Sequence, residues 1–230
     1  MKTTNLGALV LSAVIGCSEP EAPQVPLQTM TIGVDAVRIH EGNPYDTTRT
    51  QFADVNYAGQ PVMVGNSAED GFSRALVSLS FPDALFDGRQ IENARLYVTV
   101  GQTAMSSYDN SVCGLSLPLE LHANVSSRWD SDTVTWNTKP SYSAYAFTTA
   151  DVSVPCGETK EYTFDIPRFE LVGHPDIPIM YNGLVILSQD DDTKQFRKEQ
   201  IARHGGNYQI GRAVQVDAVL SDFKAEVDYR

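Results

Sequence analysis

The sequence predicts an all-β fold, an antiparallel β-sandwich of jelly-roll type with at most one short helix. Apolar residues recur at every second position along several segments, and turn residues such as Gly and Asn separate these segments. Because successive side chains of a strand point to opposite faces, a period of two gives each strand one buried face and one solvated face. This pattern is typical of antiparallel sheets that pack on one side.

Four segments carry the alternation most clearly, and we expect each to be a strand: 75–81, 94–100, 117–125 and 214–220. We expect turns at Asn66-Ser67, Asp87-Gly88, Asn182-Gly183 and Gly205-Gly206-Asn207, because these residue types favour turn conformations. One short helix is expected over 166–172, where Asp165 can cap the start and Gly173 can end it.

The composition narrows the classes of function. The chain has 230 residues, 42% of them hydrophobic and 20% charged, which is typical of a globular domain with its own core. Its formal net charge is −12. Nonspecific binding to nucleic acid or anionic lipid requires a cationic surface, so the sequence disfavours both of these functions. No run of 18 or more apolar residues is present, so the sequence predicts no transmembrane helix.

The first 17 residues have the pattern of a bacterial signal peptide. Lys2 supplies the positive charge, and an apolar run follows over 6–15. The run ends in Val14-Ile15-Gly16-Cys17, which resembles the lipobox of bacterial lipoproteins. The resemblance implies cleavage before Cys17 and diacylation of this residue. The alternative is an ordinary secretory signal in which the cysteine is incidental.

The rest of the chain divides into three parts. Residues 18–28 are rich in Pro and Glu and predict an extended tether. One β-sandwich domain is expected over 29–221, followed by a C-terminal tail over 222–230. Ser18 after the cysteine favours the outer membrane, by resemblance to the sorting rule of Gram-negative lipoproteins. We therefore expect a lipid-anchored protein of the bacterial cell envelope, at the outer membrane or cell surface.

Two cysteines remain if Cys17 carries lipid. In an exported protein, Cys113 and Cys156 are expected to form one disulfide. In the loop-entropy view such a bond contributes about 4 kcal/mol to stability. The alternative is two unpaired thiols.

Four stretches of the body form a recognisable order of motifs. They are 56–59 with 62–65, 74–81 with 91–96, Trp129-Asp130 with 133–137 and Pro140, and 162–166 with 182–186 and 196–199. The third stretch is the most specific, and together they resemble the DNRLRE-domain family, which is grouped as carbohydrate-binding module family 96. The resemblance implies a noncatalytic, exported β-sandwich of the kind found on cell-surface and polysaccharide-acting proteins.

Aromatic residues near the third motif are candidates for glycan binding, because aromatic rings pack on the apolar faces of pyranose rings. Trp129 precedes a turn, and Tyr142 and Tyr145 follow in a loop where amphipathic Tyr suits a half-exposed ligand face. The alternative for these residues is packing within the fold. Trp136 belongs to the alternating segment 133–136, which we expect to be a strand with this side chain in the core.

Two charged clusters add further candidates. Arg197 and Lys198 belong to a basic stretch on an otherwise acidic chain and are candidates for contacting an acidic polysaccharide; the alternative is a set of surface ion pairs. The carboxylates of Asp190, Asp191 and Asp192 are candidate ligands of a structural Ca²⁺, which prefers oxygen donors. The alternative is an acidic turn. No other cofactor is expected.

The sequence contains no motif that indicates catalysis. The four histidines show no zinc-protease spacing, and no nucleophile elbow, P-loop or dinucleotide fingerprint is present. We therefore expect a noncatalytic surface lipoprotein that binds polysaccharide or mediates adhesion, with the membrane contacted only through its lipid. One alternative is a structural or assembly protein of the envelope that binds another protein. A minor alternative is a polysaccharide-degrading enzyme.

Overall fold

The computed structural model describes residues 25–41, 50–67, 71–82, 85, 89–104, 116–168, 182–188 and 216–230. These residues form nine strands and one short 3-10 helix: β1 (Gln28–His40), η1 (Thr50–Asp54), β2 (Val62–Ser67), β3 (Gly71–Ser80), β4 (Ile91–Ala104), β5 (Leu117–Ala123), β6 (Thr148–Val152), β7 (Thr159–Pro167), β8 (Leu184–Ser188) and β9 (Val216–Tyr229). Within this part of the chain no helix has the length and apolar character of a membrane span.

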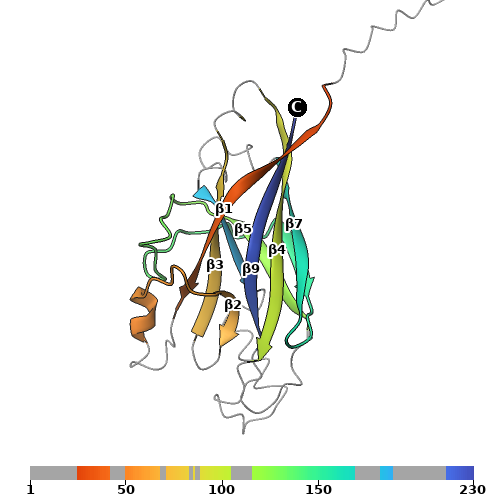
Figure 1. The fold of residues 1–230 in the computed structure, drawn as a ribbon. Helices are drawn as coiled ribbons and strands as arrows, with labels where there is room; N and C mark the ends of the chain where they lie inside the picture. The colour runs from red at the N-terminus through yellow and green to blue at the C-terminus, as the bar shows by residue number, and fades with distance from the viewer. Residues whose placement is uncertain are drawn as a thin grey trace, which may run out of the picture.

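The strands form two antiparallel layers that share strands along one side (Figure 1). Sheet A contains β7, β4 and β9 in that order, and sheet B contains β6, β5, β8 and β3. The first part of β1 pairs with β9 and its second part with β3, and β2 divides its pairing in the same way. The chain crosses repeatedly from one sheet to the other, as in folds of jelly-roll type. The predicted antiparallel β-sandwich is confirmed.

A glycine occupies each point where a strand changes sheets. Pairing of β1 passes from β9 to β3 between Ile32 and Gly33, and pairing of β2 does so between Val64 and Gly65. A Cβ on Gly33 would lie 3.3 Å from the Cβ of Ser80, so the absence of a side chain allows the close approach of β1 to β3. Glycine in a strand often marks such a bend.

The main core lies between the two sheets. It is built from the inward positions of the alternating strands, among them Val77, Leu96, Val98, Leu119, Leu121, Phe164, Ile166, Ile186 and Val227, all of which are buried. On the side away from β1 and β2, Gln102 of β4 links the sheets: its amide donates to the Val152 carbonyl at 3.3 Å and accepts from the Val154 N–H at 3.0 Å. These two hydrogen bonds therefore join the two sheets at the edge where β6 lies near β7.

A second apolar cluster covers part of the outer face of sheet B. Its buried residues are Val37, Ile39, Phe72, Leu76, Val185 and Leu187 from the strands and Ala53, Val134 and Trp136 from outside them. The segment 124–147, here called the cover segment, and η1 supply the second group. Strand β8 is therefore buried on both faces, with all five of its residues inaccessible to solvent.

Several expected boundaries are wrong. Asn66 and Ser67 pair with β3 and belong to β2 rather than to a turn. Ile166 is buried and pairs with Ala94 as a strand residue, and β7 continues to Pro167. The helix expected over 166–172 therefore does not begin at position 166. Residues 222–230 are not a tail, since β9 runs to Tyr229 between β1 and β4 and buries alternate side chains. Segments 87–88 and 205–207 lie outside the described residues.

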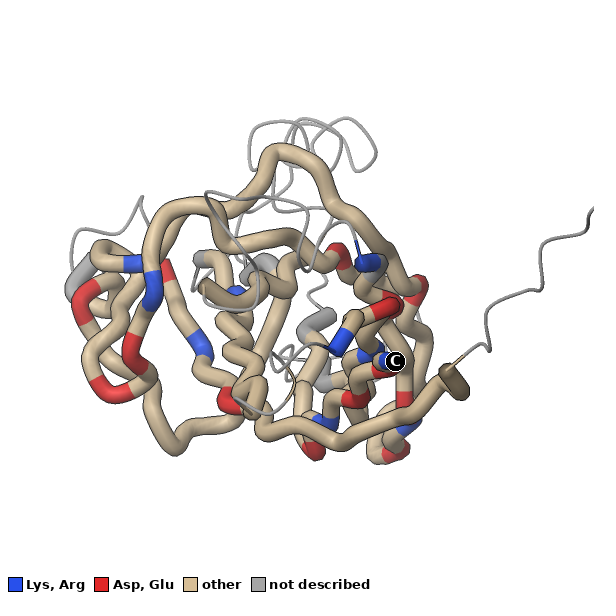
Figure 2. The backbone as a smooth tube through the Cα atoms, turned by 90° about the horizontal axis from the view of Figure 1, so that it is seen from above, with Lys and Arg blue, Asp and Glu red and all other residues tan. Residues whose placement is uncertain are grey.

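The predicted signal peptide, residues 1–17, and residues 18–24 of the tether predicted over 18–28 also lie outside the described residues. Residues 25–27 of the predicted tether are exposed and have no regular structure, whereas Gln28 already belongs to β1. The first described residues with regular structure are those of β1, whose start pairs with the end of β9: Gln28 lies opposite Tyr229. Seen from above, acidic and basic positions lie close together around the C-terminus (Figure 2). Mixed charges of this kind favour local ion pairs over a field of one sign.

Candidate ligand-binding groove

Buried Asn124, at the end of β5, fixes the start of the cover segment. Its side-chain amide donates to the carbonyl of Ser127 at 2.7 Å and to that of Asn182 at 2.6 Å, and its side-chain oxygen accepts from the Ser126 N–H. A buried amide with all these partners is strongly oriented. Asn124 therefore holds the residues before β8 against the start of the cover segment.

Residues 131–133 and 136–138 form two turns, so the strand expected over 133–136 is not present. Asp130 shapes the first turn, because its carboxylate accepts the Asp132 N–H at 2.8 Å and its carbonyl accepts the Val134 N–H at 2.9 Å. Asn56 fastens this turn from outside by donating to the carbonyls of Ser131 and Val134. The expectation that Trp136 is buried is confirmed, but its side chain packs in the second cluster and not in a strand.

Cation–π contacts hold the C-terminal part of the cover segment against β3. The guanidinium of buried Arg74 lies 4.4 Å from the ring centroid of Trp136 and 5.0 Å from that of Tyr142. The Lys139 ammonium lies 4.1 Å from the Trp136 ring and donates to the Trp136 carbonyl. Cation–π contacts are stronger where water is excluded, at about 2 kcal/mol. Arg74 therefore connects β3 to the cover segment.

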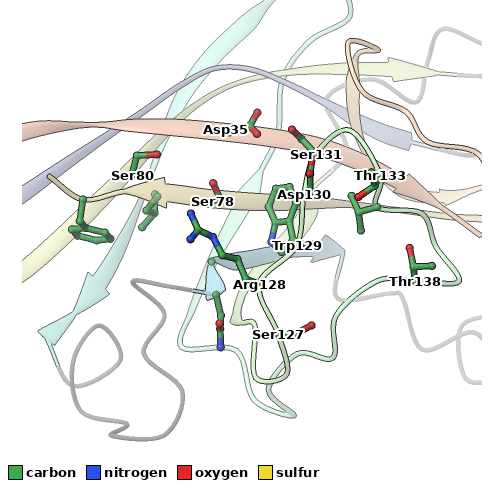
Figure 3. Close-up of a pocket in the computed structure, with 15 residues that line it drawn as sticks. Asp35, Ser78, Ser80, Ser127, Arg128, Trp129, Asp130, Ser131, Thr133 and Thr138 are labelled. Atoms are coloured by element: carbon green, nitrogen blue, oxygen red, sulfur yellow. The ribbon is translucent and has the colours of Figure 1, made fainter. Parts of the chain in front are cut away.

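Beside the cover segment a groove of about 1150 Å³ opens over the outer face of sheet B (Figure 3). Asp35 of β1 and Ser78 and Ser80 of β3 line one side. Residues 127–131, Thr133, Val134 and Thr138 of the cover segment, together with Leu79, Phe81, Asn182 and Gly183, complete the lining. The groove lies where the outward positions of β1 and β3 change from apolar, at Val37 and Leu76, to polar.

Charged and hydroxyl groups face this groove. Exposed Arg128 makes no hydrogen bond or ion pair with any residue that the structure describes, and the same holds for exposed Asp35. Six of the lining residues are Ser or Thr. Ligand sites combine a concave surface with a few polar groups that fix orientation, so the arrangement suits a ligand rich in hydrogen-bonding groups.

Trp129 forms part of the groove lining and also packs against the second cluster. Its buried indole N–H has no hydrogen-bond partner in the described part of the protein. A Cβ added to Gly183 would lie 3.3 Å from this nitrogen and would clash with the carbonyl of Val77. Gly183 also has φ = 86°, a conformation that side chains disfavour. Glycine at this position therefore permits the close packing of β3, Trp129 and the start of β8.

The sequence of residues 45–167, more than half of the chain, matches carbohydrate-binding module family 96. The chain belongs to this family. A search of curated proteins finds no match. The predicted resemblance is therefore confirmed, and the matched residues include η1, the cover segment and the buried Arg74.

In this family 96 module the predicted aromatic candidates occupy different surroundings. Trp129 lines the groove. Tyr142 does not line it: its ring packs between Arg74 and His122, 5.3 Å from the His122 ring in an edge-on arrangement. Tyr145 is 85% exposed and also lies outside the groove lining. A role of any of the three in glycan binding stays a prediction.

Other predicted residues cannot be placed. Cys17, Cys113, Arg197 and Lys198 and the three aspartates Asp190, Asp191 and Asp192 lie outside the described residues. The Cys156 sulfur is in a disulfide, but its pairing with Cys113 stays a prediction. No group of three or more His, Cys, Asp or Glu side chains that could hold a metal comes together in the parts of the chain that are described.

Sequence reasoning missed Asp35 and Arg128. Arg128 adjoins Trp129 and could have been singled out as a cation beside a candidate aromatic residue. No neighbouring sequence feature distinguishes Asp35, since it is one polar residue in an alternating strand. Only the register that places it opposite Ser78 brings it to the groove.

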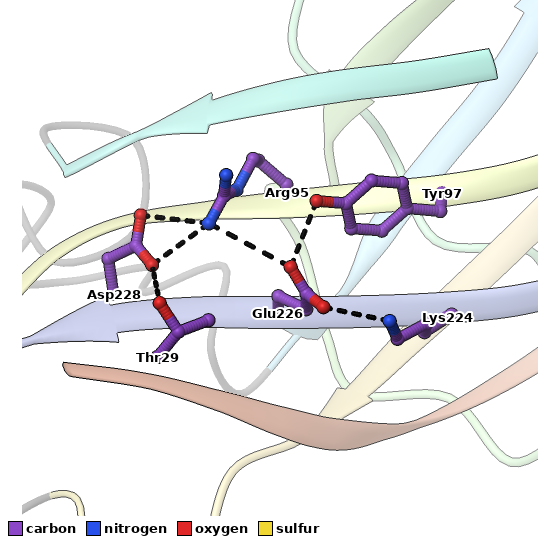
Figure 4. A network of polar contacts seen from close by, with 6 residues as sticks. All are labelled: Thr29, Arg95, Tyr97, Lys224, Glu226 and Asp228. Carbon is purple, nitrogen blue, oxygen red and sulfur yellow. Dashed lines mark hydrogen bonds and ion pairs between the residues drawn. The ribbon is translucent and has the colours of Figure 1, made fainter.

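On the outer face of sheet A, six residues of β1, β4 and β9 form a polar network (Figure 4). Arg95 donates to both carboxylate oxygens of Asp228, at 2.9 and 3.1 Å, and Thr29 donates to Asp228 at 2.6 Å. Glu226 accepts from Tyr97 at 2.9 Å and from Lys224 at 2.8 Å. Lys224, Glu226 and Asp228, which were expected in a C-terminal tail, therefore lie on a strand and have polar partners there.

We expect Gly183→Ala to destabilise the domain strongly, because the added methyl group meets the Val77 carbonyl and the Trp129 ring nitrogen. Overpacking of this kind costs about 1–3 kcal/mol, in addition to about 1–2 kcal/mol for the left-handed backbone. Gly59→Ala is the matched control, since Gly59 has φ = 73° but nothing near its added Cβ. Urea unfolding of both variants measures the difference, and equal losses of stability would contradict the close packing around Gly183.

The network should make the stability of the fold depend on pH. Hydrogen bonds from Lys224 and Tyr97 lower the pKa of Glu226 below its usual 4.5, and the bond to Glu226 raises the pKa of Lys224 above 10.5. The Glu226 contribution is present above its usual pKa and is lost as the pH falls through the lowered value. The Lys224 contribution is present below 10.5 and is lost as the pH rises through the raised value.

We therefore expect Glu226→Gln to lower Tm slightly at pH 7, with a difference from wild type that shrinks at pH values below the lowered pKa of Glu226. Thermal unfolding followed by circular dichroism over a range of pH measures this difference. Glu158→Gln, a change at an exposed carboxylate outside the network, serves as the control. A Tm difference for Glu226→Gln that does not vary with pH would show that the ion pair does not contribute.

Proposed function

We propose that this family 96 module is the binding domain of a noncatalytic, lipid-anchored protein of the bacterial cell surface, and that it binds polysaccharide in the groove beside the cover segment. The observation that carries the proposal is the groove itself, which is lined by Trp129, by hydroxyl groups, and by Arg128 and Asp35, two charged side chains that make no ion pair within the described part of the chain. Membership of a carbohydrate-binding family supports a glycan as the ligand.

The chemistry of the groove suits sugar. Arg128 offers a planar set of N–H donors, and Asp35 offers carboxylate acceptors. Sugar hydroxyls can both donate and accept, so they satisfy both side chains. The volume of about 1150 Å³ exceeds the roughly 300–1000 Å³ of most small-molecule sites. A groove of this size suits a stretch of polymer better than a single sugar ring.

The lipid anchor is the second part of the proposal. Support for it comes from Val14-Ile15-Gly16-Cys17 and from the Pro- and Glu-rich residues that follow. More than one acyl chain is needed for stable anchoring, which diacylation of Cys17 supplies. The module would then present its groove to polysaccharide while the tether holds it at the envelope.

Binding should depend on Arg128. Arg128→Ala removes the guanidinium donors from the groove, and we expect at least a tenfold rise in Kd for any polysaccharide that the wild type binds. Isothermal titration of the full chain in detergent against laminarin, xyloglucan, galactomannan and polygalacturonate measures the affinities, and chromatography of the recovered polymer checks that it stays intact.

Arg168→Ala is the control for this change, because Arg168 is an exposed arginine outside the groove lining. Tyr145→Ala tests the exposed aromatic candidate in the same titration. If Tyr145→Ala abolishes binding while Arg128→Ala leaves it unchanged, the groove is not the binding site. Release of oligosaccharides by the wild type would contradict the noncatalytic role.

Lipid attachment should require Cys17. Expressed in a Gram-negative host, the wild type should fractionate with membranes, and mass spectrometry should find acyl chains on an N-terminal Cys17. Cys17→Ser should yield an unlipidated protein, because the hydroxyl does not replace the thiol in lipid attachment. Cys113→Ser, a change at another cysteine, should leave lipidation intact. A mature N-terminus elsewhere, without acyl chains, would contradict the anchor.

A further inference from the structure

Asp35 has a position that bears on which sugars the groove accepts. It lies on β1 directly opposite Ser78 of β3, and both side chains line the groove. Cβ atoms of directly opposite residues in antiparallel strands lie about 5 Å apart. A carboxylate and a hydroxyl therefore lie side by side on one wide surface of the groove, with Ser80 further along β3.

The Asp35 carboxylate is not neutralised within the described structure. Neither a hydrogen bond nor an ion pair joins it to another described residue, and Arg128 makes no ion pair with it. Arg128 projects from the cover segment, whereas Asp35 projects from β1 (Figure 3). A ligand in the groove therefore meets an acceptor-only, negatively charged group at this point.

The other charges of the described groove lining do not reverse this sign. The charged residues of the described lining are Asp35, Asp130 and Arg128, so carboxylates outnumber guanidinium groups. One oxygen of Asp130 is already used by the Asp132 N–H in the turn. The chain as a whole carries a formal net charge of −12, which disfavours the approach of a polyanion.

An ionised carboxylate accepts hydrogen bonds and cannot donate them. Two adjacent hydroxyls of a sugar ring can both donate to it, whereas a sugar carboxylate or sulfate at the same place brings no donor and repels it. Unpaired like charges of this kind are a general means of rejecting a ligand. We propose that Asp35 determines which sugars the groove accepts: it binds the hydroxyls of an uncharged sugar residue and excludes a carboxylate or sulfate there. This inference rests on the proposed function.

The test compares the affinity of the full chain in detergent for neutral and anionic polymers of similar length. Laminarin, xyloglucan and galactomannan are the neutral probes, and polygalacturonate and chondroitin sulfate are the anionic ones. Wild type should bind at least one neutral polymer at least tenfold more tightly than either anionic polymer. Asp35→Asn should reduce this ratio at least tenfold, because the amide no longer repels an anion and accepts fewer hydrogen bonds.

Asp151→Asn is the matched control. It removes the same unit of charge from an exposed position on β6, away from the groove lining, so it reports the effect of net charge alone and should leave the ratio unchanged. Circular dichroism of each variant checks the fold. A shift with Asp151→Asn as large as that with Asp35→Asn overturns the inference, as does no shift with Asp35→Asn.

The outcomes separate this inference from the proposed function. Preference of the wild type for polygalacturonate or chondroitin sulfate overturns the role of Asp35 and leaves polysaccharide binding in place. If the wild type binds none of the five polymers, the proposed function fails, and the inference fails with it. A ratio that persists at high ionic strength supports a local contact, because distant charges are screened there.

Discussion

The apolar outer face of sheet B is the constraint on which the rest of this module depends. Val37, Leu76 and Val185 point away from the main core, so the sandwich alone would leave them in water. Burial of apolar surface contributes roughly 25 cal/mol per Å², which favours any segment that can cover this face. The cover segment and η1 do so with Trp136, Val134 and Ala53, and Arg74 stacks between the rings of Trp136 and Tyr142. The Trp129–Pro140 motif that resembles the family is therefore a packing motif, because it covers this face.

The groove is a consequence of where this cover stops. Along β1 and β3 the outward positions turn from Val37 and Leu76 to Asp35 and Ser78, and polar side chains need no apolar cover. The edge of the cover segment, around Arg128 and Trp129, then becomes one wall, and the bare sheet becomes another surface of the groove. Asn124 holds this wall in place by donating hydrogen bonds to the carbonyls of Ser127 and Asn182. Residues that stabilise the cover thus also shape the proposed binding groove, and a change in the cover alters the shape of the groove.

The alternation in the sequence was sufficient to predict the sandwich, because a period of two directly reports strands with one buried face. It could not show that sheet B is buried on both sides, although the unbroken apolar run Leu184–Leu187 carried that signal. The tail expected over 222–230 is wrong because the partners of its charged residues come from β1 and β4 as well as from β9 itself, and only the fold brings these strands together. The groove depends on register between distant strands, which no local pattern contains. Trp129 was identified from its motif, whereas Asp35 required the fold.

Strand β1 connects two parts of the molecule that the sheets otherwise separate. It begins beside the end of β9 in sheet A, bends at Gly33 and then carries Asp35 on the surface of the groove in sheet B. If a ligand binds at Asp35 as proposed, a pull on the chain ahead of Gln28 is transmitted to it along this one strand. A force along β1 loads its backbone hydrogen bonds to β9 and β3 in shear. These bonds then share the force and do not break one at a time. With the proposed anchor and the proposed ligand, β1 is the strand that carries tension between the N-terminal end of the module and the groove.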